Sequence, residues 1–306
     1  MANTFSFNAS FRAAAAPLGK ALGLAGLVVC LLGPMGTIAA DSKLPALSAA
    51  QIVAKNVAAR GGLASWQAVQ AMTWSGKLDG GGGNSAERSA RLMRSASVPT
   101  NKKDLTKDAS VVPKPEEDKQ VQLPFTMSMA RPGKSRVELE VAGKTAVQVF
   151  DGSNGWKVRP FLNRNDVEPF SPAELKSEQD KGDLDGPLFN YAAKGTKIDV
   201  ESVEPVEGRS AYKLKLTLKN GTVQHIWIDA QSFLDVKVEG SPRQMDGRMR
   251  TVWIYQRDFR SVQGLLIPFV YETAVDGYRD THKMIIEKVT VNPKLSGDSF
   301  AKPRGA

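Results

Sequence analysis

The sequence contains few side chains of the kinds that bind metals or act as nucleophiles. It has two histidines, His225 and His282, and one cysteine, Cys30. Histidines that bind zinc or iron together are usually spaced as HxH or HExxH, and neither spacing occurs here. We therefore interpret each histidine as a surface or cross-strand residue, and we predict no metal site.

Other catalytic patterns are also missing from the sequence. No GxSxG nucleophile motif occurs, and the glycine run at 80–83 lacks the Lys-Ser/Thr that completes a phosphate loop. Glu138 and Glu140 share a strand face, but it is the charged one, whereas acid–base catalysis needs a pocket that raises one pKa. We predict that the protein is not an enzyme and uses no cofactor.

The first 40 residues have the composition of a secretory signal peptide. They contain no acidic residue and two basic ones, followed by an apolar run at 21–32 and a small-residue end at Ala39 and Ala40. The apolar run is shorter than the ~20 residues that span a bilayer, which argues against the alternative of a retained anchor. We predict a signal peptide at 1–40 and a periplasmic location in a Gram-negative envelope.

The mature chain would contain no cysteine and would be basic. Cys30 lies inside the apolar run, and Val29 before it is not the small residue that a lipidation signal requires. The remaining chain has 39 basic and 32 acidic residues, a net charge of +7. Its lysines are spread along strand faces rather than clustered with aromatic residues, which argues against nucleic acid and favours an anionic membrane surface or an acidic partner.

The clearest structural pattern lies at 212–229. Leucines alternate with lysines and a threonine over 213–219, Asn220-Gly221 follows, and a second alternating run begins at Val223. This predicts a β-hairpin with one apolar face. A two-residue turn would place Leu216 opposite His225, whereas a three-residue loop places Leu214 opposite Ile226. We favour the three-residue loop, which keeps the aliphatic residues together and leaves Trp227 on the other face, where a helix or a lid would have to cover it.

The same alternation, less regular, predicts a large antiparallel sheet. Strands are expected at 71–78, 121–129, 136–141, 145–150, 156–159, 197–203, 210–219, 223–229, 234–239, 248–257, 265–275 and 281–291, and helices at 47–60, 63–69, 171–181 and 188–193. Residues 79–120 are rich in Gly, Pro and charge. We interpret them as a flexible insertion loop that is dispensable for folding, with a docking arm as the alternative.

An apolar sheet face of this kind suggests a container for an apolar ligand. Met127 and Met129 strengthen this interpretation, because methionine adapts to varied apolar shapes. Ordinary core packing is the alternative for both, and it is the first interpretation for Trp156 and Trp253, with cavity walls the second.

Several segments together resemble a known family. They are Ala59-Arg60-Gly61-Gly62, Trp74-Ser75-Gly76, Arg131-Pro132-Gly133, Phe150-Asp151-Gly152-Ser153-Asn154-Gly155-Trp156, Ile228-Asp229-Ala230, Gly264-Leu265-Leu266-Ile267-Pro268-Phe269, and Ile286-Glu287-Lys288-Val289-Thr290-Val291-Asn292-Pro293. These segments resemble the outer-membrane lipoprotein-sorting proteins, the LolA/LolB-like superfamily, and in particular its broad branch without assigned ligands. The Asp-Gly-x-x-Gly-Trp turn and the Gly-Leu-x-x-Pro strand entry are the most specific marks.

The resemblance implies an α+β, mostly antiparallel fold: an unclosed, half-open β-barrel with helices lidding an apolar cavity, formed by a single domain at 41–306. It implies a lipid or lipoprotein carrier that holds acyl chains for transport to or from the outer membrane, acting as a monomer with a membrane-associated donor or acceptor. The alternative is an envelope sensor or binding module of the same fold without transport. The residues predicted to line the cavity are Phe125, Met127, Met129, Val137, Leu139, Val147, Val149, Trp156, Leu214, Leu216, Ile226, Ile228 and Trp253.

Overall fold

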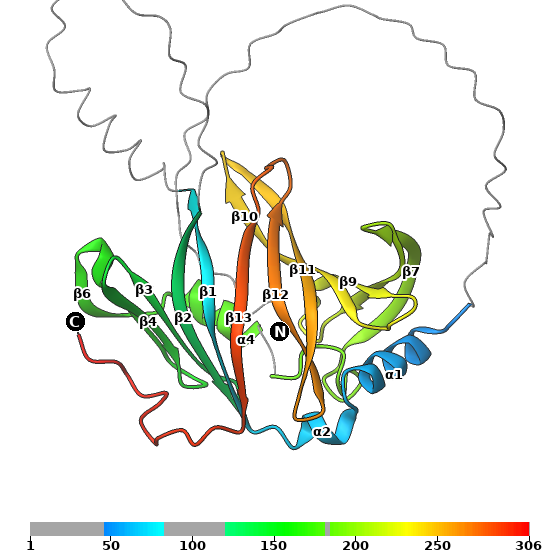
Figure 1. The fold of residues 1–306 in the computed structure, drawn as a ribbon, viewed down its shortest axis with the longest axis horizontal. Coiled ribbons are helices and arrows are strands. Elements are labelled where there is room, and N and C mark those ends of the chain that lie inside the picture. The colour runs from blue at the N-terminus through cyan, green and yellow to red at the C-terminus, as the bar shows by residue number, and fades with distance from the viewer. Residues whose placement is uncertain (1–45, 83–119, 181–183, 306) are drawn as a thin grey trace, which may run out of the picture. The chain divides into compact units, whose positions relative to one another are not determined.

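The computed structural model describes residues 46–82, 120–180 and 184–305 (Figure 1). Its helices are α1 (Ala49–Ala59), α2 (Leu63–Gln67) and α4 (Pro172–Asp180), with a 3₁₀ turn η2 (Pro160–Leu162). Its strands are β1 (Ala71–Gly82), β2 (Gln120–Ala130), β3 (Lys134–Val141), β4 (Lys144–Phe150), β5 (Gly155–Arg159), β6 (Arg164–Pro169), β7 (Lys197–Val206), β8 (Arg209–Thr217), β9 (Val223–Asp229), β10 (Asp235–Met245), β11 (Arg248–Val262), β12 (Leu265–Val275) and β13 (His282–Val291).

These thirteen strands form one antiparallel sheet in the order β6-β5-β4-β3-β2-β1-β13-β12-β11-β10-β9-β8-β7. Strands that follow one another in sequence are paired, except β6 and β7, and β1 also pairs with β13 and so joins the two halves of the sheet. β6 and β7 form the two edges, so the sheet is unclosed. The predicted fold class, mostly antiparallel β with few helices, is confirmed.

Helix α1 begins with a capping box at Ser48. The Ser48 side chain accepts a hydrogen bond from the Gln51 amide at 3.3 Å, and the Gln51 side chain accepts one from the Ser48 amide at 2.9 Å. These contacts satisfy two amides that a helix N-terminus leaves without partners. The helix buries Ile52 and Val53 and ends before Gly61.

Two local predictions are wrong. Residues 188–193 form turns rather than a helix, and Asn190 has a left-handed backbone with φ of 51°, which a continuing helix does not allow. Strand β6 is absent from the predicted strands, because its sequence Arg-Asn-Asp-Val-Glu-Pro has no apolar alternation; as an edge strand it pairs only with β5.

The predicted register of the hairpin formed by β8 and β9 is confirmed. Leu214 is opposite Ile226, and the Leu218 amide donates to the carbonyl of Thr222 at 2.9 Å across a three-residue loop. Gly221 takes a φ of 84°, which suits glycine. Trp227 is buried on the other face as expected, but side chains of neighbouring strands cover it, among them Trp253, and not a helix or a lid.

The predicted insertion loop falls mostly outside the described residues. The strand before it is longer than predicted, because β1 continues to Gly82, and β2 begins at Gln120. Residues 83–119 and the predicted signal peptide at 1–40 lie outside the described part of the chain.

Candidate functional site: an apolar sheet face and its cover

One face of the sheet carries a continuous set of apolar side chains. Trp74 in β1 is opposite Met127 in β2 and Val289 in β13. Directly paired residues project to the same side of a sheet, so the registers carry this face from strand to strand. Following them through β12, β11, β10 and β9 leads to Leu214 in β8, which is opposite Ile226. We call this side the inner face and the opposite side the outer face.

Nine of the thirteen predicted cavity residues lie on the inner face. They are Phe125, Met127, Met129, Val137, Leu139, Leu214, Leu216, Ile226 and Ile228. All of them except the half-buried Val137 are buried. Their role in ligand binding stays a prediction.

The other four predicted residues lie on the outer face. Val149 is opposite Arg136 in β3 and Trp156 in β5, so all three project to the same side of the sheet. That side is the outer face, because Ser135, the neighbour of Arg136, is opposite Met129 on the inner face. Val147 lies two residues before Val149 and projects to the same face. Trp253 is opposite Glu239, which projects to the outer face because its neighbour Val238 is opposite Ile226 on the inner face. Strand β4 has apolar residues on both faces, so its sequence does not determine which of them point inward.

The middle of the inner face contains large residues that our sequence analysis did not assign to the site. Trp74, Ile267, Tyr271 and Ile286 are each at most 1% exposed. The alternation of Leu265, Ile267, Phe269 and Tyr271 along β12 is a usable signal for them. Burial raises the pKa of the Tyr271 hydroxyl far above its usual value.

Helices α1 and α2 and residues 184–196, here called the cover, pack together over one end of the sheet. Figure 1 shows α2 at the ends of β11 and β12, and the Leu266 amide donates to the Arg60 carbonyl at 3.1 Å. Trp66 of α2 packs against Phe189 with 5.3 Å between ring centroids. Both rings are fully buried, so the cover adds its own apolar side chains to the interior.

A buried ion pair joins the cover to the inner face. Arg60 lies 3.4 Å from Asp235, and both side chains are less than 10% exposed. The guanidinium also stacks on Trp66 and Phe189, with 4.8 and 5.0 Å to the ring centroids. Asn56 donates to the same Asp235 carboxylate at 2.5 Å. Several contacts thus compensate the cost of burying these charges.

A second buried carboxylate, Asp185, holds the other part of the cover. Arg131, at the end of β2, reaches it at 3.2 Å, and Lys194 reaches it at 2.9 Å. Arg131 also donates to the Val69 carbonyl at 2.9 Å. The cover is therefore fixed to both halves of the sheet by charged side chains rather than by apolar packing alone.

Helix α4 lies on the inner face near the β6 edge. Lys157 of β5 contacts the Glu174 carboxylate, with 2.7 Å to Oε2, and Ser135 of β3 donates to Glu178 at 3.2 Å. Burial alone would raise the pKa of Glu174, but hydrogen bonds from Lys157 and Ser171 hold it below its usual value.

Among the described residues, the buried polar atoms without a partner are the indole Nε1 of Trp74, Oδ1 of Asn56, and Nε of Arg60, Arg159 and Arg250. Of these, Trp74 lies in the middle of the inner face. The indole Nε1 of Trp74 is buried, and no acceptor among the described residues lies within hydrogen-bonding distance. Buried polar groups are nearly always hydrogen-bonded, so this donor marks a place where the interior suits an additional acceptor.

His225 is a cross-strand residue, as the sequence predicts. His225 lies on the outer face between Glu201 and Glu239 of neighbouring strands, and the His225 Nε2 is 3.4 Å from Glu201. Within residues 46–82, 120–180 and 184–305, no three His, Asp, Glu or Cys side chains are grouped to hold a metal ion. In the same ranges, no helix is both long and apolar enough to cross a bilayer.

No protein-family model matches the chain, and no curated protein matches it. Among solved structures, a LolA superfamily protein from Nitrosomonas europaea is similar at 13% identity with a TM-score of 0.47, covering 84% of this chain and 99% of that one. A domain named for outer membrane lipoprotein sorting, from Vibrio parahaemolyticus, is similar at 12% identity with a TM-score of 0.45, covering 82% and 95%. A DUF1329 family protein from Desulfovibrio piger is similar at 12% identity with a TM-score of 0.48, covering 81% and 95%.

The first two names belong to the group that the sequence resembles. At these identities and scores, the likenesses assign the chain neither a family nor a ligand.

Proposed function

We propose that this protein binds the acyl chains of a lipid or lipoprotein between the inner face and the cover, and carries them through the periplasm to or from the outer membrane. It acts as a monomer and meets a membrane-associated donor or acceptor. The observation that carries the proposal is the continuous apolar inner face, which runs through nine adjacent strands from β3 to β8.

The composition of this face supports acyl-chain binding. Each buried CH₂ group contributes about 0.8 kcal/mol, so a few acyl chains bind tightly without polar contacts. Three methionines, Met72, Met127 and Met129, lie close together on paired strands of the inner face. Their flexible side chains suit a ligand whose chains vary in length and shape.

The free donor of Trp74 supports a ligand with a carbonyl group. The ester or amide carbonyl that joins an acyl chain to its head group is a suitable acceptor for the indole N–H. Acyl chains alone offer no such acceptor, so the proposal favours lipids and lipoproteins over plain hydrocarbons.

Replacement of Trp74 by phenylalanine tests this proposal. Trp74→Phe removes the donor and keeps an aromatic ring on the inner face, so we expect affinity for a fluorescent acyl ester to fall about 3–10-fold, as for one lost hydrogen bond. The matched control is Trp253→Phe on the outer face, which should leave affinity unchanged. Fluorescence titration measures both.

Two results would contradict the proposal. The first is wild-type protein that binds no acyl ester and carries no lipid when purified from the periplasm. The second is an equal loss of affinity in Trp74→Phe and Trp253→Phe while both variants remain folded. A stable protein partner without any lipid would instead favour the sensor.

A further inference from the structure

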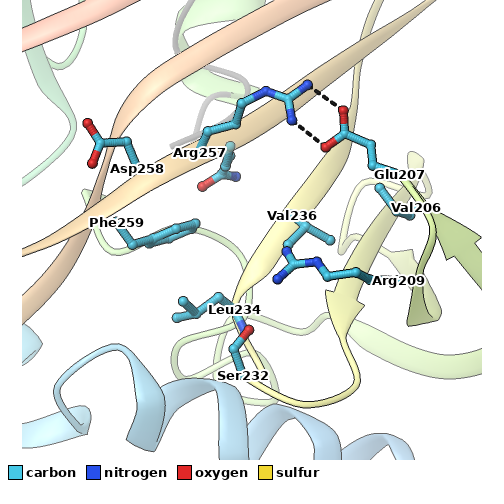
Figure 2. Close-up of a pocket in the computed structure, with 10 residues that line it drawn as sticks. Val206, Glu207, Arg209, Ser232, Leu234, Val236, Arg257, Asp258 and Phe259 are labelled. Carbon is cyan, nitrogen blue, oxygen red and sulfur yellow. Dashed lines mark hydrogen bonds and ion pairs between the residues drawn. The ribbon is translucent and has the colours of Figure 1, made fainter.

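A pocket of about 370 Å³ lies where strands β10 and β11 separate (Figure 2). Arg257 and Phe259 line it from the outer face, and Gln256, which is opposite Tyr271, lines it from the inner-face side of β11. The pairing of these strands begins at Lys237 and Tyr255. Before that point β10 pairs only with β9, and β11 continues to Val262 beside β12. The sheet therefore has a gap between the start of β10 and the second half of β11. The volume of the pocket is at the lower end of the range for small-molecule sites.

The pocket has an apolar wall. It is formed by Phe259 of β11, by Val236 at the start of β10 with Leu234 just before that strand, and by Val206 at the end of β7. Val206 and Val236 belong to the outer-face cluster that contains Trp227, so this wall is held by a packed core. This wall suits a short hydrocarbon chain.

The acidic side chains at the rim are already paired. Glu207 forms a two-pronged ion pair with Arg257, drawn as dashed lines in Figure 2. Asp258 is paired with Arg260. Hydrogen bonding to Arg257 holds the pKa of Glu207 below its usual value, so this carboxylate stays ionised and engaged.

Arg209 is the cation at this site that is not part of the ion pair between Glu207 and Arg257. Its Nε lies 3.3 Å from Asp229, a carboxylate that also accepts hydrogen bonds from the amides of Gln231 and Ser232 and from the Ser232 hydroxyl. The side chain of Arg209 is 62% exposed, so a ligand can reach its two terminal amino groups. Figure 2 shows its guanidinium directed toward Val236, beside the apolar wall.

We propose that this pocket binds a small amphiphilic anion: a short hydrocarbon chain against Val236 and Phe259, with a carboxylate or phosphate head held by the terminal amino groups of Arg209. A guanidinium binds such heads with two parallel hydrogen bonds, which a lysine cannot do. The charged end of this site is on the outer face, and the proposal does not depend on the proposed function.

Calorimetric titration with octanoate tests the site, with octanol, octyl phosphate and acetate as comparison ligands. We expect octanoate and octyl phosphate to bind saturably, octanol to bind at least 10-fold more weakly, and acetate not to bind. Arg209→Gln should weaken octanoate binding at least 10-fold and leave octanol unchanged, and Arg209→Lys should recover only part of it. The matched control is Arg248→Gln, an exposed arginine at the start of β11.

A second variant separates the pocket from the inner face. Val236→Trp fills the apolar wall and should abolish octanoate binding, while affinity for the long acyl ester should stay within 2-fold of wild type. Octanoate binding that is unchanged in Arg209→Gln and in Val236→Trp would overturn the proposal. Octanoate that competes with the long acyl ester would overturn it too, because the two ligands would then share the inner face.

Discussion

At the scale of the residue, Asp229 shows how a buried charge is stabilised in this protein. Its side chain is 2% exposed, and it closes the turn between β9 and β10 by accepting hydrogen bonds from two amides and a hydroxyl. Burial alone would raise the pKa of this carboxyl group. The hydrogen bonds from Ser232 and the charge of Arg209 outweigh it, so that the pKa lies below the usual 3.8.

This lowered pKa predicts a pH-dependent loss of stability. A carboxyl group whose pKa is lower in the folded state contributes its full stabilisation when the pH is above its pKa in the unfolded state. The contribution disappears as the pH falls through its pKa in the folded state. We expect Asp229→Asn to lower the free energy of unfolding by about 1–2 kcal/mol at pH 7. The difference from wild type should shrink as the pH falls below 3.8.

Urea unfolding at several pH values measures this difference. Asp258→Asn is the control, because that carboxylate is 43% exposed and its pairing with Arg260 contributes little to stability. A difference between Asp229→Asn and wild type that stayed constant from pH 7 to pH 3 would rule out the charge as its cause.

At the scale of the element, Gly61 joins the cover to the sheet. It ends α1 with a φ of 108°, and a side chain there would place its Cβ 2.4 Å from the carbonyl oxygen of Gly264, in the turn between β11 and β12. Any other residue would be strained in its backbone and would also push the two segments apart.

We therefore expect Gly61→Ala to lower the free energy of unfolding by about 3 kcal/mol or more, because the steric clash adds to the backbone strain. Gly208→Ala is the matched control. Gly208 has a φ of 79°, but a Cβ added there would have no heavy atom within 4 Å, so the substitution should cost only about 1 kcal/mol. Equal losses in the two variants would show that Gly61 is not in close contact with Gly264.

The elements were predictable to different degrees. The hairpin at 212–229 followed from sequence, because leucines alternate regularly over 213–219 and, of the two registers considered, only the three-residue loop keeps Leu214 and Ile226 on the same face. Strand β4 was harder, since Ala146 and Phe150 are apolar on one face and Val147 and Val149 on the other. The polar edge strand β6 gave no signal, because its place at the edge is set by pairing with β5.

At the scale of the whole molecule, the connection between the two halves of the sheet was not predictable from sequence. Pairing of β1 with β13 joins residues more than 200 positions apart, such as Met72 and Val291. Local patterns carry no information about such a contact. The cover depends on similarly distant contacts, such as the ion pair between Arg60 and Asp235, so the roles of Arg60, Asp235 and Asp185 in holding the cover could not be predicted from sequence.

This arrangement gives the two faces of the sheet separate uses. The inner face and the cover are proposed to hold long acyl chains, and the small pocket near Arg209 has its charged end on the outer face. Side chains of the sheet lie between them, with Ile226 on one side and Trp227 on the other. Ligands of the two sites should therefore bind independently.

The most direct test of the central claim is photo-crosslinking with a long acyl ester that carries a diazirine near the end of its chain. Mass spectrometry of the digested protein then locates the adducts. We predict adducts on inner-face residues such as Met127 and Leu214, and none on Val149, which is equally buried on the outer face. Adducts confined to the outer face, or spread without preference over both faces, would contradict the proposal that the inner face holds the acyl chains.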